Sequence, residues 1–243
     1  MRSLLLKSSV GLSLLSPVLL VAEQVVFQFP ESGLRLAPFL EIVIGFTVIA
    51  LAPALILMCT SFVRLLVVFG ILRTALGTGK IPPNSVMLIL ALMLTGFIMM
   101  PTFQALNNDA LAPYTAGDID YKEALDNGKS VLFDFMFKFT SDDDIAMFHD
   151  MSNSPKVSEP DELSFFVVAP AFMLGELRRG FTIGFLLYIP FLLIDLITAS
   201  VLMSMGMMML PPSMISLPFK LLLFVLIDGW RLLVTSLVQG FSG

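Results

Sequence analysis

Charged side chains that interrupt long apolar stretches are the residues of this chain most able to do chemistry. Glu176 and Lys220 flank one apolar run, and we expect them to pair because an unpaired buried charge is costly. The alternative is that each finds another partner or extends its head group to water. Arg64 and Asp195 are two further candidates for buried charge pairing.

A second use of such charges is proton transfer. Glu41, Asp195 and Asp228 lie inside apolar runs, where carboxylates can form the relay of a proton-coupled transporter. Catalysis is less well supported, because the only cysteine, Cys59, and the only histidine, His149, lie far apart in the sequence. No P-loop, HExxH or GxSxG pattern is present. We therefore expect no catalytic residue, no metal site, no cofactor and no enzymatic activity.

Methionine is concentrated in one short segment. The twelve residues Met203–Met214 contain six of the chain's sixteen methionines. On a helix, three consecutive methionines at 207–209 would cover more than half of the circumference, which no single packing stripe explains. Unbranched, polarizable side chains around an axis would form a soft seal, although they could also fill a crowded core. The candidate gate residues are Met205, Met207, Met208 and Met209.

The composition is typical of an all-α membrane protein. Hydrophobic residues make up 57% of the 243 positions, mean hydropathy is +0.92, and charged residues make up only 14%, against about 25% in soluble domains. The net charge of −5 argues against nucleic acid as a partner. The length and the single acidic insert favour one membrane domain, residues 23–243, after a signal peptide at residues 1–22. An uncleaved first helix is the alternative.

Apolar segments of about 20 residues predict the membrane-crossing helices. The first connector contains Arg64, Arg73 and Lys80 and no acidic residue, which predicts a cytoplasmic location for it. The insert at residues 107–163 has thirteen acids and four lysines, a net of 4 − 13 = −9, and we expect it in the periplasm. The four predicted spans are Phe39–Met58, Asn84–Phe103, Phe181–Leu202 and Ser213–Val238.

Two short helices are predicted inside the acidic insert. The first begins near Asp120 and should break at Gly128, because glycine is unfavourable in a helix interior. The second begins after Ser141, a favourable N-cap residue that is followed by three aspartates in the first turn.

Pro-Pro pairs mark two turns between apolar helices. Pro82-Pro83 precedes the second predicted span and Pro211-Pro212 precedes the fourth, so each pair is a candidate hairpin tip. The spans also contain charges and prolines, which are tolerated where neighbouring protein covers them. One chain of this size has too few helices for that purpose. We therefore expect kinked, charge-bearing helical hairpins buried in an oligomer.

Six blocks of sequence resemble the FliP family, the export-gate subunits of the bacterial flagellar type III secretion apparatus. The likeness covers roughly residues 40 to 240 and rests most on two C-terminal blocks. The blocks are Thr60–Arg64, Leu72–Thr78, Pro170–Phe185, Ile194–Asp195, Ala199–Pro212 and Ser216–Lys220.

The resemblance implies a ring-like gate in the bacterial inner membrane, within the flagellar basal body. It implies a homo-oligomer, a pentamer in that family, that assembles with FliQ-like and FliR-like subunits and passes unfolded export substrates. It also implies that the Met-rich loop acts as a gasket, at Met207, Met208 and Met209 of this chain. The sequence leaves two alternatives open, a virulence type III secretion gate and a small-solute transporter coupled to protons.

Overall fold

The computed structural model describes residues 57–79, 81–152, 163–207 and 209–242, together with Val43, Phe46, Thr47 and Ala50. Contacts divide the chain into two units, Met1–Ala50 and Leu51–Gly243. In the first unit the four described residues are helical. The predicted signal peptide, and most of the first predicted span, lie outside the described residues.

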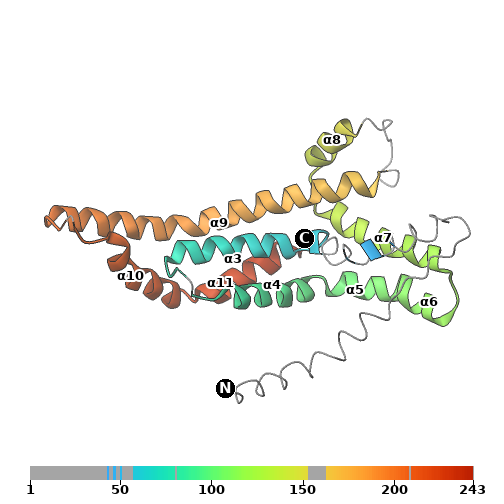
Figure 1. The fold of residues 1–243 in the computed structure, drawn as a ribbon, viewed down its shortest axis with the longest axis horizontal. Coiled ribbons are helices and arrows are strands. Elements are labelled where there is room, and N and C mark those ends of the chain that lie inside the picture. Colours follow the sequence, from blue (N-terminus) through green and yellow to red (C-terminus); the bar gives the residue numbers. More distant parts are fainter. Residues whose placement is uncertain are drawn as a thin grey trace, which may run out of the picture. The chain divides into compact units, whose positions relative to one another are not determined.

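Every regular element in the described part of the second unit is helical, which confirms the all-α prediction for these residues. Figure 1 shows their order along the chain. The elements are α3 (Phe62–Leu76), α4 (Asn84–Ile98), α5 (Met100–Leu106), the π-helix η1 (Asn107–Leu111), α6 (Ala112–Ala116), α7 (Tyr121–Lys138), α8 (Asp142–Met151), α9 (Phe165–Ser204), α10 (Pro212–Leu226) and α11 (Gly229–Gln239).

The core of the second unit forms where α3 packs along α9 (Figure 1). Leu65, Phe69 and Leu72 of α3 are fully buried there. Two glycines of α9 allow the close approach. A Cβ at Gly184 would lie 2.3 Å from Cδ1 of Ile71, and one at Gly180 would lie 3.1 Å from Val67. Small residues four positions apart bring helix backbones together in this way.

Helix α9 is much longer than the predicted third span, Phe181–Leu202. It begins at Phe165, sixteen residues before the start of the predicted span. The prediction excluded the charged segment around Glu176 and Arg178, but these side chains form ion pairs that allow the helix to continue. At 1.5 Å per residue, 40 residues extend about 60 Å, roughly twice the hydrocarbon thickness of a bilayer.

The second and fourth predicted spans are bent. Helix α4 meets the segment Met100–Ala116 at 60°, and α10 meets α11 at 61°. Among the described residues, length and hydropathy suffice for crossing a bilayer in one unbroken helix, Phe165–Ser204. Two further spans are present only if each bent pair counts as one.

The acidic insert contains both predicted helices. Asp120 caps α7, and Ser141 caps α8 by accepting a hydrogen bond from the backbone N–H of Asp144. The break predicted at Gly128 was wrong, since α7 continues to Lys138. A Cβ at Gly128 would approach Leu106 to 3.2 Å, so the glycine serves packing between α7 and α5.

Candidate gate segment and its buried charge network

A buried ion pair joins α3 to α9. Arg64 donates hydrogen bonds from Nε and Nη2 to the two carboxylate oxygens of Glu176, at 2.8 and 2.5 Å. Both residues are almost completely buried. Arg179 adds a third contact to Glu176 at 3.1 Å and donates to the backbone carbonyl of Phe139 at the end of α7. Such bidentate pairing is a strong, orientation-specific form of charge-assisted hydrogen bonding.

The C-terminal residues also contact Arg64. Its Nη1 donates to the carbonyl of Gly240 at 3.3 Å, and its guanidinium lies 3.6 Å from the ring centroid of Phe241. The Phe241 ring stacks on Phe135 and meets Phe139 edge-on. Arg64 therefore connects α3, α9 and the end of the chain to the aromatic side chains of α7.

A second ion pair, between a buried lysine and a half-buried aspartate, joins α9 to α10. Lys220 donates to Asp195 at 2.6 Å and to the carbonyl of Ala75, in the last turn of α3, at 3.0 Å. Ser216 donates to the other carboxylate oxygen of Asp195 at 2.5 Å. The ammonium group of Lys220 thus also satisfies a carbonyl at a helix C-terminus, where positive charge is favourable.

The predicted Glu176–Lys220 pair was wrong within this chain. Glu176 binds Arg64 and Lys220 binds Asp195, so each charge has a nearer partner. The reason is the position of the two carboxylates on one continuous helix. Nineteen residues separate Glu176 from Asp195, which corresponds to about 28 Å along α9.

The methionine segment lies between α9 and α10. Helix α9 ends in a Schellman motif, in which Gly206 adopts φ of +74° and donates to the carbonyl of Met203. The backbone N–H of Met207 donates to the carbonyl of Leu202 at 3.0 Å. Only glycine accepts this left-handed conformation readily, so Gly206 fixes where the helix stops. Pro211 and Pro212 then begin α10.

Most methionine side chains of this segment are exposed in the chain. Met209 is 98% exposed, and Met203, Met205 and Met214 are more than half exposed. Met207 is half-buried, and Met208 lies outside the described residues. Core filling within the chain therefore does not explain these four exposed side chains, and they are available to another subunit or to a passing molecule.

Each Pro-Pro pair lies between two helices. Pro82 and Pro83 lie between α3 and α4, and Pro83 is the residue before the first turn of α4. Pro211 holds the corresponding position before α10, with Pro212 as the first helical residue. Both α3–α4 and α9–α10 are in contact, as helical hairpins require.

Comparison with known proteins decides the family. The FliP family model matches residues 46–237, which is most of the chain. The chain belongs to the FliP family.

Several relatives named flagellar biosynthetic protein FliP support this assignment. The chain is 50% identical to the protein of Caulobacter vibrioides over 196 residues, covering 81% of this chain and 74% of that protein. It is 44% identical to the protein of Aquifex aeolicus, covering 94% and 98%. Identity to the Bacillus subtilis protein is 47%, covering 80% and 88%.

Four residues that were not predicted from the sequence contribute to this FliP-family site. Ser216 binds Asp195 and lies one helical turn before Lys220 on the same face, a spacing that could have revealed it. Gly180 and Gly184 carry the four-residue spacing of close helix contacts. The contact between Phe241 and Arg64 leaves no local signal, because 177 residues separate the two.

The acidic insert of this FliP-family chain is attached to α9 by a further ion pair. Arg178 donates from Nη2 to Asp144 at 2.6 Å. The hydrogen bond from Ser141 lowers the pKa of Asp144 below its ordinary value; burial opposes this shift, and Arg178 lowers the pKa further. Within the described part of the chain, no three metal-ligating side chains gather at one site.

Proposed function

We propose that this FliP-family protein is a subunit of the flagellar type III protein export gate in the bacterial inner membrane. Copies of the chain, five by resemblance, assemble with FliQ-like and FliR-like subunits in the basal body. Unfolded flagellar proteins pass through the resulting pore. The chain supplies a passage, and we assign it no catalytic role.

The proposal depends on the exposed methionines at the turn between α9 and α10, which we call the methionine tip. The two helices form a hairpin that an ion pair holds together. Met205 and Met209 are 65% and 98% exposed at the junction of α9 and α10. Lys220 and Asp195 hold the two helices together below that tip. Repeated around an axis, flexible methionines can close against water and ions and yield to a passing chain.

Assembly is supported by the apolar side chains that the isolated chain leaves uncovered. Large exposed hydrophobic residues recur along α4, α9 and α10, and include Met93, Phe97, Phe185, Ile197 and Val225. Exposed apolar surface on this scale is typical of protein or membrane contact. In contrast, the charges on these helices are paired inside the chain, so neighbouring subunits are not required to neutralise them.

The pairing of Asp195 weakens the alternative of a proton-coupled transporter. Its carboxylate accepts hydrogen bonds from both Lys220 and Ser216, an arrangement that serves to hold α10 against α9.

Ion leakage tests the proposed gate. Replacing Met207 and Met209 with alanine should leave the complex assembled and raise the ion permeability of membranes that contain it. Met151, an exposed methionine in the acidic insert, provides the matched control, and its alanine variant should not leak. An assembled double variant whose ion permeability equals that of the wild type would contradict the proposal.

A further inference from the structure

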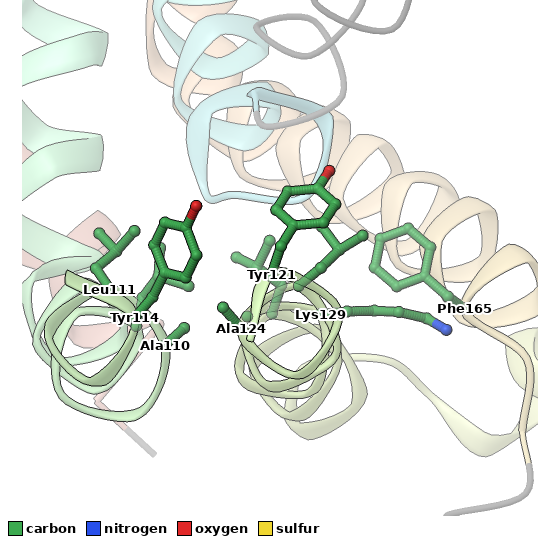
Figure 2. A pocket seen from close by; sticks show the side chains of 11 residues that line it. Ala110, Leu111, Tyr114, Tyr121, Ala124, Lys129 and Phe165 are labelled. Carbon is green, nitrogen blue, oxygen red and sulfur yellow. The ribbon is translucent and has the colours of Figure 1, made fainter. Parts of the chain in front are cut away.

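An apolar groove crosses the acidic insert. It has a volume of about 410 Å³ and lies between the segment Leu106–Tyr114 and α7, with Phe165 at one end. Figure 2 shows Ala110 and Ala124 between the two helices, with the hydroxyl groups of Tyr114 and Tyr121 turned to the same side. The walls and floor are Leu106, Ala110, Leu111, Tyr114, Tyr121 and Leu125.

The groove is apolar although it lies in the most acidic part of the chain. Leu111, Tyr121 and Leu125 are each more than half exposed along it. Grouped apolar side chains of this kind, in a segment with a net charge of −9, indicate a surface that another molecule covers. Lys129 is the only charged residue among its lining residues, and Figure 2 shows its amino group extending toward Phe165.

A polar hollow adjoins the groove at Lys129 and Phe165, which line both. It also has a volume of about 410 Å³, and two carboxylates, Asp126 and Asp134, line it with two serine hydroxyls. Within the described ranges, none of these three charged side chains forms an ion pair. One cation and two anions therefore lie around a hollow that opens beside an apolar groove.

The position in the fold matches a membrane surface. Leu106 and Ala110 belong to the far end of a bent apolar pair, and Phe165 begins the long apolar helix α9. Tyrosine and lysine beside the ends of apolar helices are typical of the boundary between lipid and water.

We propose that the groove and the hollow together bind one phospholipid with a phosphate–amine head group. This inference rests on the membrane location given under the proposed function. An acyl chain occupies the groove, Lys129 binds the phosphate, and Asp126 or Asp134 binds the primary ammonium group. The site then selects among lipids by charge and by hydrogen bonding.

The charges explain the expected selectivity. A primary ammonium group has N–H donors for a carboxylate, whereas the quaternary amine of phosphatidylcholine has none. Phosphatidylglycerol offers a phosphate to Lys129, but it has no ammonium group for the two aspartates to bind. Phosphatidylethanolamine satisfies both signs of charge, and we expect the site to prefer it.

Competition among lipids tests the site. The full-length protein in detergent is mixed with equal amounts of dioleoyl phosphatidylethanolamine, phosphatidylglycerol and phosphatidylcholine, and native mass spectrometry counts the retained lipid. We expect about tenfold preference for phosphatidylethanolamine, the scale that one charge-assisted hydrogen bond supplies. Lys129→Gln should remove about tenfold of the binding, and Ala124→Trp should abolish it by filling the groove.

Lys122→Gln is the matched control, because Lys122 is exposed on α7 and does not line the groove. It should retain phosphatidylethanolamine as the wild type does. Equal retention of the three lipids, or retention unchanged in Lys129→Gln, would overturn the proposal, and helix content by circular dichroism checks folding. A cross-link from a groove residue such as Tyr121 to a second copy of the chain, in place of lipid, would overturn the proposal as well.

This outcome is separable from that of the proposed function. If the methionine variants leak but no lipid is selected, only the lipid site fails. If alkaline extraction releases the protein from membranes, the membrane location fails and both proposals fall.

Discussion

The guanidinium of Arg64 and the carboxylate of Glu176 lie 2.5 Å apart across the α3–α9 interface, with both side chains buried. Burying two charges costs free energy, and charge-assisted hydrogen bonds to both partners offset part of that cost. Arg64 makes two bonds to Glu176 and one to Gly240, and Glu176 also binds Arg179. The pair therefore fixes the register between the two helices more than it adds net stability.

Breaking this pair should destabilise the chain strongly. Glu176→Gln leaves a buried guanidinium without its counter-charge, a change that costs about 3–5 kcal/mol in buried pairs. Thermal unfolding in detergent measures the effect. The control is Glu123→Gln, at an exposed position in the first turn of α7, which should change stability little. If Glu176→Gln is as stable as this control, the pair does not bind the two helices together.

Lys220 should matter more than its hydrogen-bond neighbour Ser216. Lys220→Met removes the partner of Asp195 and the donor to the Ala75 carbonyl, whereas Ser216→Ala removes one hydrogen bond to a carboxylate. Because Asp195 keeps access to water, the free-energy cost of leaving it without Lys220 is reduced. We expect a loss of stability of about 2–3 kcal/mol for Lys220→Met and about 1 kcal/mol for Ser216→Ala. Chemical unfolding of both variants gives the order, and the reverse order would refute it.

A methyl group at Gly184 should separate α3 from α9. Its Cβ would lie 2.3 Å from Cδ1 of Ile71 and 2.9 Å from Cβ of the same residue, and only the first of these can move easily. We expect Gly184→Ala to cost about 1–3 kcal/mol, the usual scale of overpacking. Gly96→Ala is the matched control, because nothing lies within 4 Å of its added Cβ and alanine favours the helix. A Gly184→Ala protein as stable as Gly96→Ala would show that the interface tolerates the methyl group.

Acid should weaken the attachment of α8 to α9. The pKa of Asp144 is lowered in the folded state from its ordinary value of 3.8, so the carboxylate adds stability above that value. This contribution is lost as pH falls through the lower pKa of the folded state. Unfolding measured between pH 2 and pH 6 should therefore show a smaller acid loss in Asp144→Asn than in the wild type. Identical pH profiles would mean that the Ser141 and Arg178 contacts do not hold the charge.

The contact between the C-terminal residues and Arg64 can be tested by shortening the side chain of Phe241. Phe241→Ala removes the ring that covers the guanidinium and contacts Phe135 and Phe139. Cation–π and aromatic contacts of this kind contribute about 0.5–2 kcal/mol. Proteolysis at α7 should quicken in this variant, while Ser242→Ala serves as the control, since its hydroxyl bonds only within the last turn. Equal cleavage rates would leave the aromatic cluster without a role in holding α7.

The helices were predictable where local sequence decides them. Asp120 and Ser141 start their helices because their side chains satisfy free backbone N–H groups, and the Pro-Pro pairs begin α4 and α10 because proline lacks a donor. The continuation of α9 through Glu176 and Arg178 was not predictable from local sequence. Their charges are paired by Arg64 and Asp144, which lie in distant segments.

The choice of charge partners was the least predictable part of the site. The sequence identified Arg64, Glu176, Asp195 and Lys220 as candidates for buried pairing, but which of them meet depends on the tertiary packing of three helices. Gly128 illustrates the same limit in α7. Its low helix propensity predicted a break, yet the close contact with Leu106 makes the missing side chain useful.

The central claim is that the methionine tip lines the path of an exported chain. A photoreactive residue at position 209 tests it most directly, in assembled complexes that hold an export substrate stalled by a folded domain. We predict cross-links between position 209 and the stalled substrate, and none from position 151 in the acidic insert. Cross-links from position 209 only to lipid or to neighbouring subunits, with substrate present in the complex, would contradict the claim.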